Sequence, residues 1–368
     1  MTPKPKILVA PLNWGLGHAT RCIPIIKELL NHGFEPIIAS DGVALTLLQA
    51  EFPDLKALEL PSYQITYPKK GKHFKFKMIW NSPKMLKAIK SEKKIVKQIC
   101  NELGISGIIS DNRLGVYYKK VPSVFITHQL TVLTGNTTWF SSKVHEKIIQ
   151  KFQMCWVPDV PSKQNLSGKL GRNDHLSVPI AHLGPLSRFE KKELEKKYKL
   201  LILLSGPEPQ RTLLEEKILT EIAFFKEACL LVRGVVDPNA EQIKHDLDHL
   251  TAVNFMTSKD LEQAVNSSEM VLCRSGYTTI MDLAKLEKKA FFIPTPGQYE
   301  QEYLAKSLDE QGVVPMATQD DFSIGMLKRI PDYKGLKSFT YQANYSSLFG
   351  VFSRVKENSE PTSGTLST

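Results

Sequence analysis

The chain has 368 residues, 42% hydrophobic and 23% charged, which is the composition of a globular protein large enough for more than one domain. No apolar run approaches the roughly 18 residues of a membrane-spanning helix, and the N-terminus lacks the apolar stretch of a secretory signal. Five single cysteines without a CxxC pair exclude a zinc ribbon and argue against a disulfide framework. We therefore expect a cytoplasmic protein.

The formal net charge of +10 is concentrated in one segment. Residues 69–98 hold eleven lysines and one glutamate, so the rest of the chain is nearly balanced. Apolar side chains are interleaved with these lysines, as in helices that lie on anionic membranes. Two interpretations stay open: a solvated lysine-rich face, or a surface that makes the protein peripheral on the inner face of the plasma membrane. We expect no nucleic acid partner.

In the first half of the chain, short apolar runs alternate with helical patterns. Runs rich in β-branched residues predict strands at 6–11, 34–39, 56–60, 106–110, 122–127 and 153–157. Helical periods fall between them, notably at 20–32 and 82–103. Gly33 follows the first of these helices as a stop signal.

The second half repeats this scheme. Strands are predicted at 200–205, 228–234, 252–256, 269–273 and 290–294. Strands that alternate with helices form a parallel sheet covered on both faces, so two such sets predict two doubly wound α/β domains. The expected divisions are an N-terminal domain at 1–158, a connector at 159–198, a C-terminal domain at 199–350 and a disordered tail at 351–368. Ligands of such sheets bind beyond the carboxyl ends of the strands, which makes the cleft between the domains the expected site.

The stretch NWGLGHATR at 13–21 follows the first predicted strand. Gly15 and Gly17 match the first two glycines of the dinucleotide fingerprint G-x-G-x-x-G, but Thr20 stands at the third. Asp41 follows the second strand, where a ribose-binding acid would lie, and this keeps an NAD site as an alternative.

His18 is the residue in this loop that we expect to do chemistry. At the start of a helix the dipole disfavours the imidazolium, so the ring stays neutral and can accept a proton. A general base needs an orienting partner, and Asp111, at the end of another strand of the same sheet, is placed to be that partner. The alternatives are a structural histidine and a helix N-cap aspartate.

The segment VLCRSGYTTIMDLAKLEKKAFFIPTPGQYEQEYLAKSL, residues 271–308, resembles the nucleotide-sugar site of glycosyltransferase family 28. The resemblance rests on CRSG at a strand end, on Asp282 six residues after that glycine, on P-x-P and on the following Q-E-Y. It covers the C-terminal domain well and the N-terminal domain mainly through GLGH. It implies the GT-B fold, two Rossmann-like doubly wound parallel-sheet domains facing a cleft, in an inverting, metal-independent transferase whose donor is a nucleotide sugar, with UDP favoured.

The donor site that the resemblance implies lies mainly in the C-terminal domain. The turn RSGYTT offers backbone amides at a positive helix end for a diphosphate, and Asp282 is a carboxylate for the ribose hydroxyls. The expected donor-binding residues are Arg188, Ser205, Gly206, Arg211, Phe255, Met256, Arg274, Ser275, Gly276, Thr278, Asp282, Gln301 and Glu302. The family has glutamine where this chain has Glu302, so the sugar is left open.

On the acceptor side, the candidates lie in the glycine loop and at strand ends. They are Gly15, Gly17, Asn112, Arg113, His128 and Gln129. The basic segment favours a lipid-linked or glycolipid acceptor, as in the synthesis of cell envelope glycans. A sugar-nucleotide 2-epimerase of the same fold and a non-catalytic basic binding protein remain the alternative functions.

The string HDLDH at 245–249 has histidines at the spacing of a zinc helix. A third ligand and the zincin glutamate are missing, so we expect a solvated helix there. We predict no metal site and no resident cofactor; the nucleotide sugar is a co-substrate.

Overall fold

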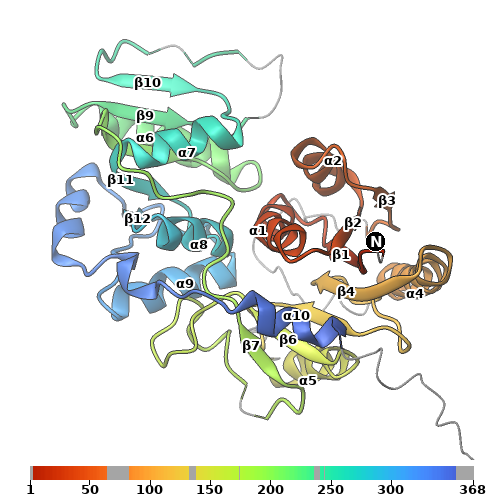
Figure 1. The fold of residues 1–368 in the computed structure, drawn as a ribbon. Coiled ribbons are helices and arrows are strands. Elements are labelled where there is room, and N and C mark those ends of the chain that lie inside the picture. Colours follow the sequence, from red (N-terminus) through yellow and green to blue (C-terminus); the bar gives the residue numbers. More distant parts are fainter. Residues whose placement is uncertain are drawn as a thin grey trace, which may run out of the picture.

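A computed structural model of the chain describes residues 3–63, 83–131, 138–173, 175–235, 241–243 and 245–353. Two α/β domains, each built on a parallel sheet, make up this structure (Figure 1). The prediction of two doubly wound parallel-sheet domains is therefore confirmed.

The N-terminal domain contains a sheet of seven parallel strands among the described residues. The strands are β1 (Lys6–Pro11), β2 (Glu35–Ser40), β3 (Ala57–Glu59), β4 (Ile105–Asp111), β5 (Ser123–Ile126), β6 (Met154–Val157) and β7 (Ile180–His182). The helices are α1 (Gly17–Asn31), α2 (Gly42–Glu51), α4 (Pro83–Leu103) and α5 (Thr138–Ile149). The strand order is β3-β2-β1-β4-β5-β6-β7. The six predicted strands are present, whereas β7 lies in the segment that we expected to be a connector.

In the described part of the C-terminal domain, a second parallel sheet contains five strands. The strands are β8 (Tyr198–Leu203), β9 (Cys229–Val232), β10 (Leu250–Val253), β11 (Ser268–Cys273) and β12 (Lys289–Phe292). The helices are α6 (Gln210–Ile222), α7 (Ser258–Asn266), α8 (Tyr277–Lys285) and α9 (Tyr299–Glu310), with the 3-10 helices η2 (Ile324–Asp332) and η3 (Leu336–Phe339). The strand order is β10-β9-β8-β11-β12, and all five strands were predicted.

The prediction of a helix over HDLDH is wrong. Residues 245–247 have no regular secondary structure, and a turn at 248–249 leads directly into β10. His249 Nε2 lies 3.1 Å from the carbonyl oxygen of Ile222, so this ring contacts the end of α6. Within the described ranges, no group of three His, Cys, Asp or Glu side chains is arranged to hold a metal ion.

The central strands are mainly apolar and buried because helices cover both faces of each sheet. In β1, the four residues from Ile7 to Ala10 are all fully buried. Helix α1 packs Ile23, Ile26 and Leu29 into the same core. Gly33, at φ +79°, adopts the left-handed conformation that follows the end of this helix.

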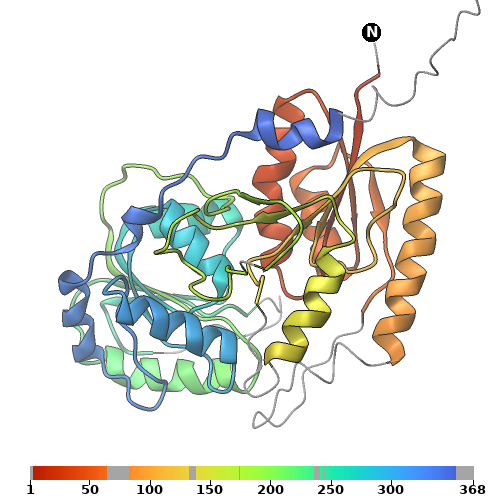
Figure 2. The ribbon, with the colours of Figure 1, turned by 90° about the horizontal axis from the view of Figure 1, so that it is seen from below.

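The last helix, α10 (Tyr345–Ser353), returns to the N-terminal domain and lies beside α1 (Figure 2). The ring of Phe349 lies 5.5 Å from that of Phe34, and Phe352 lies 6.4 Å from the same ring. This packing contradicts both the domain boundary at 350 and a tail that starts at 351, because the aromatic face of α10 is buried in the N-terminal core. Residues after Ser353 lie outside the described part of the chain.

Only part of the lysine-rich segment is described, since residues 69–82 lie outside the described ranges. From Pro83 onward the segment forms the start of α4, which buries Met85, Ala88 and Val96. Its lysines lie mainly on the other face, where those at positions 87, 90, 94 and 97 are exposed. None of the described helices combines the length and the apolar character needed to cross a membrane.

Candidate active site

His18 lies in the first turn of α1, just beyond the end of β1. Its Nδ1 lies 3.0 Å from Oδ1 of Asp111, the last residue of β4. β1 and β4 are neighbouring strands in which Pro11 is paired with Asp111, and this register brings the two loops together. The Asp111 carboxylate is fully buried, while the His18 side chain is 14% exposed. The structure thus brings together the two residues expected to act as base and orienting group.

Arg21, one turn after His18 on α1, joins this pair and was missed in the sequence. Its Nε donates to Asp111 Oδ2 at 2.5 Å, and its Nη2 contacts Asp111 Oδ1 and lies 2.7 Å from His18 Nδ1. His18 Nδ1 can serve only one of these partners. If it donates to Asp111, Nε2 keeps a free lone pair; if it accepts from Arg21, the proton is on Nε2. The spacing of three residues on one helix face was the available signal.

The environment of His18 favours the neutral imidazole. Burial lowers the pKa of His18, and the Arg21 guanidinium lowers it further, against the opposite effect of Asp111. For Asp111, burial alone would raise the pKa, but Arg21 and His18 outweigh it and hold the pKa at about 2. A neutral imidazole beside an ionised carboxylate is the arrangement that a general base requires.

The His18 loop touches the first turn of α8 in the other domain. A Cβ atom on Gly17 would lie 2.5 Å from Oγ1 of Thr278, so only glycine allows this approach. Gly276 is the N-cap of α8, and the Ser275 hydroxyl donates to the carbonyl of Gln301 at 2.8 Å. The first-turn amides of a helix lack intrahelical partners and carry its positive dipole end. An anion bound there would lie next to His18.

Asp282 lies further along α8, next to the connecting segment that carries Ser187 and Arg188. Ser187 Oγ donates to Asp282 Oδ1 at 2.6 Å. Burial raises the pKa of Asp282 to about 7, although Ser187 and Arg188 act to lower it. The Nε of Arg188 is buried and has no hydrogen-bond partner among the described residues, and its guanidinium lies 4.9 Å from the ring centre of Phe189. A buried, unsatisfied donor of this kind suits an anionic ligand.

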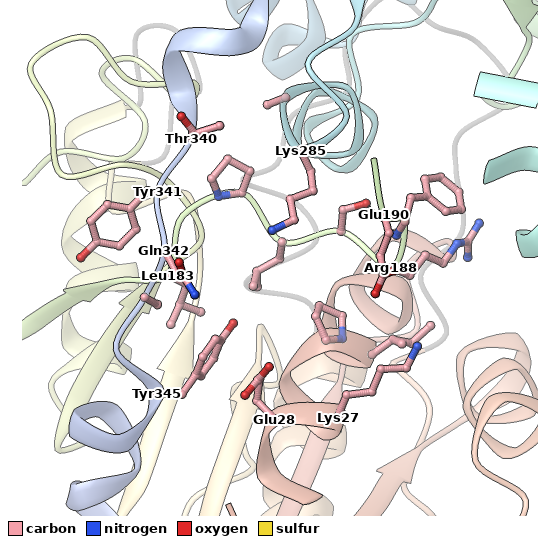
Figure 3. Close-up of a pocket in the computed structure, with 18 of the residues that line it drawn as sticks. Lys27, Glu28, Leu183, Arg188, Glu190, Lys285, Thr340, Tyr341, Gln342 and Tyr345 are labelled. Carbon is pink, nitrogen blue, oxygen red and sulfur yellow. Dashed lines mark hydrogen bonds between the residues drawn. The ribbon is translucent and has the colours of Figure 1, made fainter. Parts of the chain in front are cut away.

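A cavity of about 770 Å³ is lined in part by Ser187 and Arg188. Its walls come from α1, α8, the connecting segment at 183–190 and the returning segment at 339–346. Figure 3 shows Lys285 entering from α8, Glu28 from α1 and Tyr345 from α10, with Arg188 on the opposite side from Tyr345. The cavity therefore lies between the domains, next to the two segments that join them.

Two arginines expected at the donor contact other parts of the C-terminal domain. Arg274 is 1% exposed and donates to the carbonyls of Ile293 and Pro294 at 3.2 and 3.0 Å. Its Nε, like that of Arg188, is buried and has no hydrogen-bond partner among the described residues. Arg211 forms an ion pair with Glu215 at 2.5 Å, so its guanidinium is held inside the domain.

The other donor candidates fall into two groups. Gln301 and Glu302 bond within their own loop: Gln301 Oε1 accepts from the amide of Thr295 at 2.9 Å, and Glu302 Oε1 from that of Gly297 at 2.8 Å. The remaining candidates are exposed or half-buried just beyond the ends of β8 and β10, and they are Ser205, Gly206, Phe255 and Met256. This second group is accessible to a ligand.

Glu300 links the two domains through His128 and Gln129. Its carboxylate lies 2.9 Å from His128 Nε2 and accepts from Gln129 Nε2 at 2.6 Å. The His128 ring stacks on Tyr277 of α8 with centroids 4.0 Å apart, and the Tyr277 hydroxyl donates to the carbonyl of Pro158 at 2.8 Å. The two expected acceptor residues are thus interdomain contacts. Glu300 was missed because its neighbours Gln301 and Glu302 carried the resemblance.

Arg113, expected at the acceptor, does not face the site, and this expectation is wrong. The side chain is fully buried and donates to Glu92 and Asp41, each at 2.6 Å. Buried charges must be paired, and these two carboxylates hold the guanidinium inside the domain. Asp41 is thereby engaged as well, which removes the carboxylate that the NAD alternative needs. Asn112, with φ 56°, adopts a left-handed turn between Asp111 and Arg113.

The sequence matches known glycosyltransferases over both domains. Residues 209–330 match the model of the glycosyltransferase family 28 C-terminal domain. The UDP-N-acetylglucosamine–N-acetylmuramyl-(pentapeptide) pyrophosphoryl-undecaprenol N-acetylglucosamine transferase of Haemophilus influenzae (strain PittEE) is 26% identical over 271 residues, 72% of each chain. An uncharacterized glycosyltransferase of Methanosarcina acetivorans is 25% identical over 83% of this chain and 84% of its own.

Solved structures share the fold. MurG of Acinetobacter baumannii aligns with a TM-score of 0.54 over 98% of this chain and 96% of its own, at 12% identity. CalG4, the calicheamicin glycosyltransferase, aligns with a TM-score of 0.62 over 97% and 94%, also at 12% identity. The solved structures share the GT-B fold of this chain, and the family model and the sequence relatives support a glycosyltransferase. Within that class, residues 209–330 are similar to the family 28 C-terminal domain.

Proposed function

We propose that the chain is an inverting, metal-independent glycosyltransferase that moves a sugar from a UDP-sugar to a hydroxyl of a lipid-linked or glycolipid acceptor. The observation that carries this proposal is the contact between the His18–Asp111 pair and the N-terminal end of α8, where Gly17 touches Thr278. The name of the Haemophilus relative, with its UDP-sugar donor and undecaprenol-linked acceptor, supports the substrate classes. VinC, a structural neighbour at a TM-score of 0.58, was solved in complex with dTDP, which supports a nucleotide ligand.

In the proposed reaction, His18 Nε2 removes the proton of the acceptor hydroxyl, and the hydroxyl oxygen attacks the anomeric carbon of the donor sugar. The bond from that carbon to the diphosphate breaks on the opposite face, so the configuration inverts. Asp111 holds the Nδ1 proton and orients the ring. The diphosphate gains charge as it leaves, and Arg188 and the amides at Ser275 and Gly276 stabilise it.

The rest of the proposed donor site follows the carboxyl edge of the C-terminal sheet. Asp282 accepts the ribose hydroxyls, the backbone near Phe255 and Met256 reads the base, and the loop at Ser205 and Gly206 approaches the phosphates. Gln301 and Glu302 exchange their present loop contacts for the hydroxyls of the sugar. Gly15, Gly17 and Asn112 border the acceptor.

We also propose that the lysine-rich face of α4, together with the rest of 69–98, docks on anionic lipid. The exposed lysines of α4 support this, because each cation near such a surface adds about 1 kcal/mol of attraction. Binding to vesicles of phosphatidylglycerol that weakens with salt and is lost on replacing these lysines by glutamine would agree with the proposal. Equal recovery with neutral and anionic vesicles would contradict it.

Thermal unfolding with UDP, GDP, TDP and NAD, each at equal excess, tests the donor site. A ligand at about 100 times its Kd adds about 2.7 kcal/mol of stability, which is an easily measured shift. Stabilisation by UDP alone is expected. With a UDP-sugar in hand, His18→Ala should lower kcat by at least about a hundredfold and leave the donor Kd unchanged. Equal losses in kcat and donor affinity would make His18 a binding residue, and consumption of donor without acceptor would indicate an epimerase.

A further inference from the structure

Ser187 lies in the segment that leads from β7 into the C-terminal domain, and it is 8% exposed. Its hydroxyl group accepts a hydrogen bond from the backbone amide of Phe189 at 3.0 Å and donates one to Asp282 Oδ1 at 2.6 Å. A hydroxyl has one proton, and the amide of Phe189 can only donate. The proton of Ser187 is therefore directed at Asp282.

This bond acts on both the direction and the charge of the Asp282 carboxylate. A hydroxyl that donates to a carboxylate favours its ionised form. Burial raises the pKa of Asp282 to about 7, and the Ser187 hydrogen bond, followed by the charge of Arg188, opposes that rise. Without Ser187, Asp282 would be protonated over more of the neutral range, and its plane would be free to rotate.

Recognition of a vicinal diol by one carboxylate requires that the carboxylate be ionised and that its plane be fixed. Two adjacent hydroxyls donate to the two oxygens of an ionised carboxylate, and the plane of the group must match the diol. Ser187 fixes Oδ1 and leaves Oδ2 and the second lone pair of Oδ1 to accept.

We propose that Ser187 is a positioning residue for the donor, which holds the Asp282 carboxylate in the orientation that accepts the 2′- and 3′-hydroxyls of the nucleotide ribose. This inference rests on the proposed donor site. It adds that the connecting segment supplies part of ribose recognition without touching the ribose.

Two ligands and three variants test the proposal. UDP and 2′-deoxy-UDP differ in one of the hydroxyls that Asp282 accepts, so the ratio of their Kd values measures the diol contact. Ser187→Ala removes the positioning hydroxyl, and Ser187→Thr keeps it. Ser346→Ala is the matched control, because Ser346 lines the same cavity and its hydroxyl lies 3.1 Å from His32 Nε2, in contact with α1 and not with Asp282.

Isothermal titration calorimetry on the full chain gives each Kd, and thermal unfolding without ligand shows that each variant is folded. We expect Ser187→Ala to weaken UDP about fivefold, as the loss of one hydrogen bond does, and to weaken 2′-deoxy-UDP, which keeps only the 3′-hydroxyl, by a smaller factor. Ser187→Thr and Ser346→Ala should keep the preference of the unmodified chain for UDP.

Three outcomes would overturn the proposal. An unchanged UDP affinity in folded Ser187→Ala would show that the bond does not serve the donor. Equal losses for UDP and 2′-deoxy-UDP would reduce Ser187 to a structural residue. If the unmodified chain itself binds none of the nucleotides, the proposed donor site is wrong and this inference is wrong with it; the first two outcomes leave that site intact.

Discussion

Replacing Arg21 by methionine separates the effect of the guanidinium on the protonation of His18 from the effects of burial and the helix dipole. Arg21 Nη2 lies 2.7 Å from His18 Nδ1. Two unit charges about 4 Å apart at an effective dielectric of about 20 interact by about 4 kcal/mol. The guanidinium charge is delocalised and water screens part of it, so we count about a third of this energy. Loss of an interaction of this size is enough to change the protonation of His18 measurably.

The sign of the change follows from the groups that remain. In the Arg21→Met variant, the Asp111 carboxylate still faces His18 and now stabilises the imidazolium without competition. The pKa of His18 should therefore rise, and the acid limb of kcat/KM should move to higher pH with it.

Nuclear magnetic resonance with 13C at the histidine Cε1 positions measures this pKa without any acceptor. The chain has nine histidines, and His18→Gln assigns the signal. Arg21→Lys is the control that keeps a cation, and it should leave the pKa near that of the unmodified chain. A pKa of His18 that stays constant or falls in a folded Arg21→Met variant would refute the electrostatic argument. The dipole and burial would then be sufficient.

Three further predictions concern other charged groups. Arg113→Met leaves the buried carboxylates of Asp41 and Glu92 without their ion-pair partner and should reduce the free energy of unfolding by about 3–5 kcal/mol. Urea denaturation measures this loss, and a value below about 1 kcal/mol would be inconsistent with a buried ion-pair cluster. Glu300→Gln removes the carboxylate that contacts His128 and Gln129 across the domains and should increase the radius of gyration in small-angle X-ray scattering. An identical curve would show that other contacts hold the domains together. Since the pKa of Asp282 is about 7, UDP affinity should rise between pH 6 and 8 as this carboxylate ionises, and the same rise in Asp282→Asn would assign it to another group.

The fold was predictable because its signals are local. Strands such as β1 and β11 are short apolar runs between helical periods, and the alternation alone specifies parallel sheets. The meeting of His18 and Asp111 was also predictable, since both follow strands whose carboxyl ends share one sheet edge.

Other features depend on contacts that no local pattern reveals. Arg113 follows a strand end as Asp111 does, and its burial is decided by Glu92, which α4 brings from about twenty residues upstream. The three residues of β7 are too few to show a period. The helix α10 has apolar residues, but its position depends on contacts with rings that are distant in the sequence, such as Phe34 and Trp156.

Contact between the domains and the basicity of His18 depend on each other. Burial is the largest cause of the lowered pKa of His18, and the C-terminal domain provides part of it through Thr278 against Gly17 and through Glu300 against His128. Separation of the domains would admit water to the ring and return its pKa toward the ordinary value, because the imidazolium would regain its hydration. The neutral base beside Asp111 is therefore a property of the closed arrangement. In the proposed mechanism, His18 is therefore able to remove the proton of the acceptor hydroxyl when the donor-binding domain is in contact with the N-terminal domain.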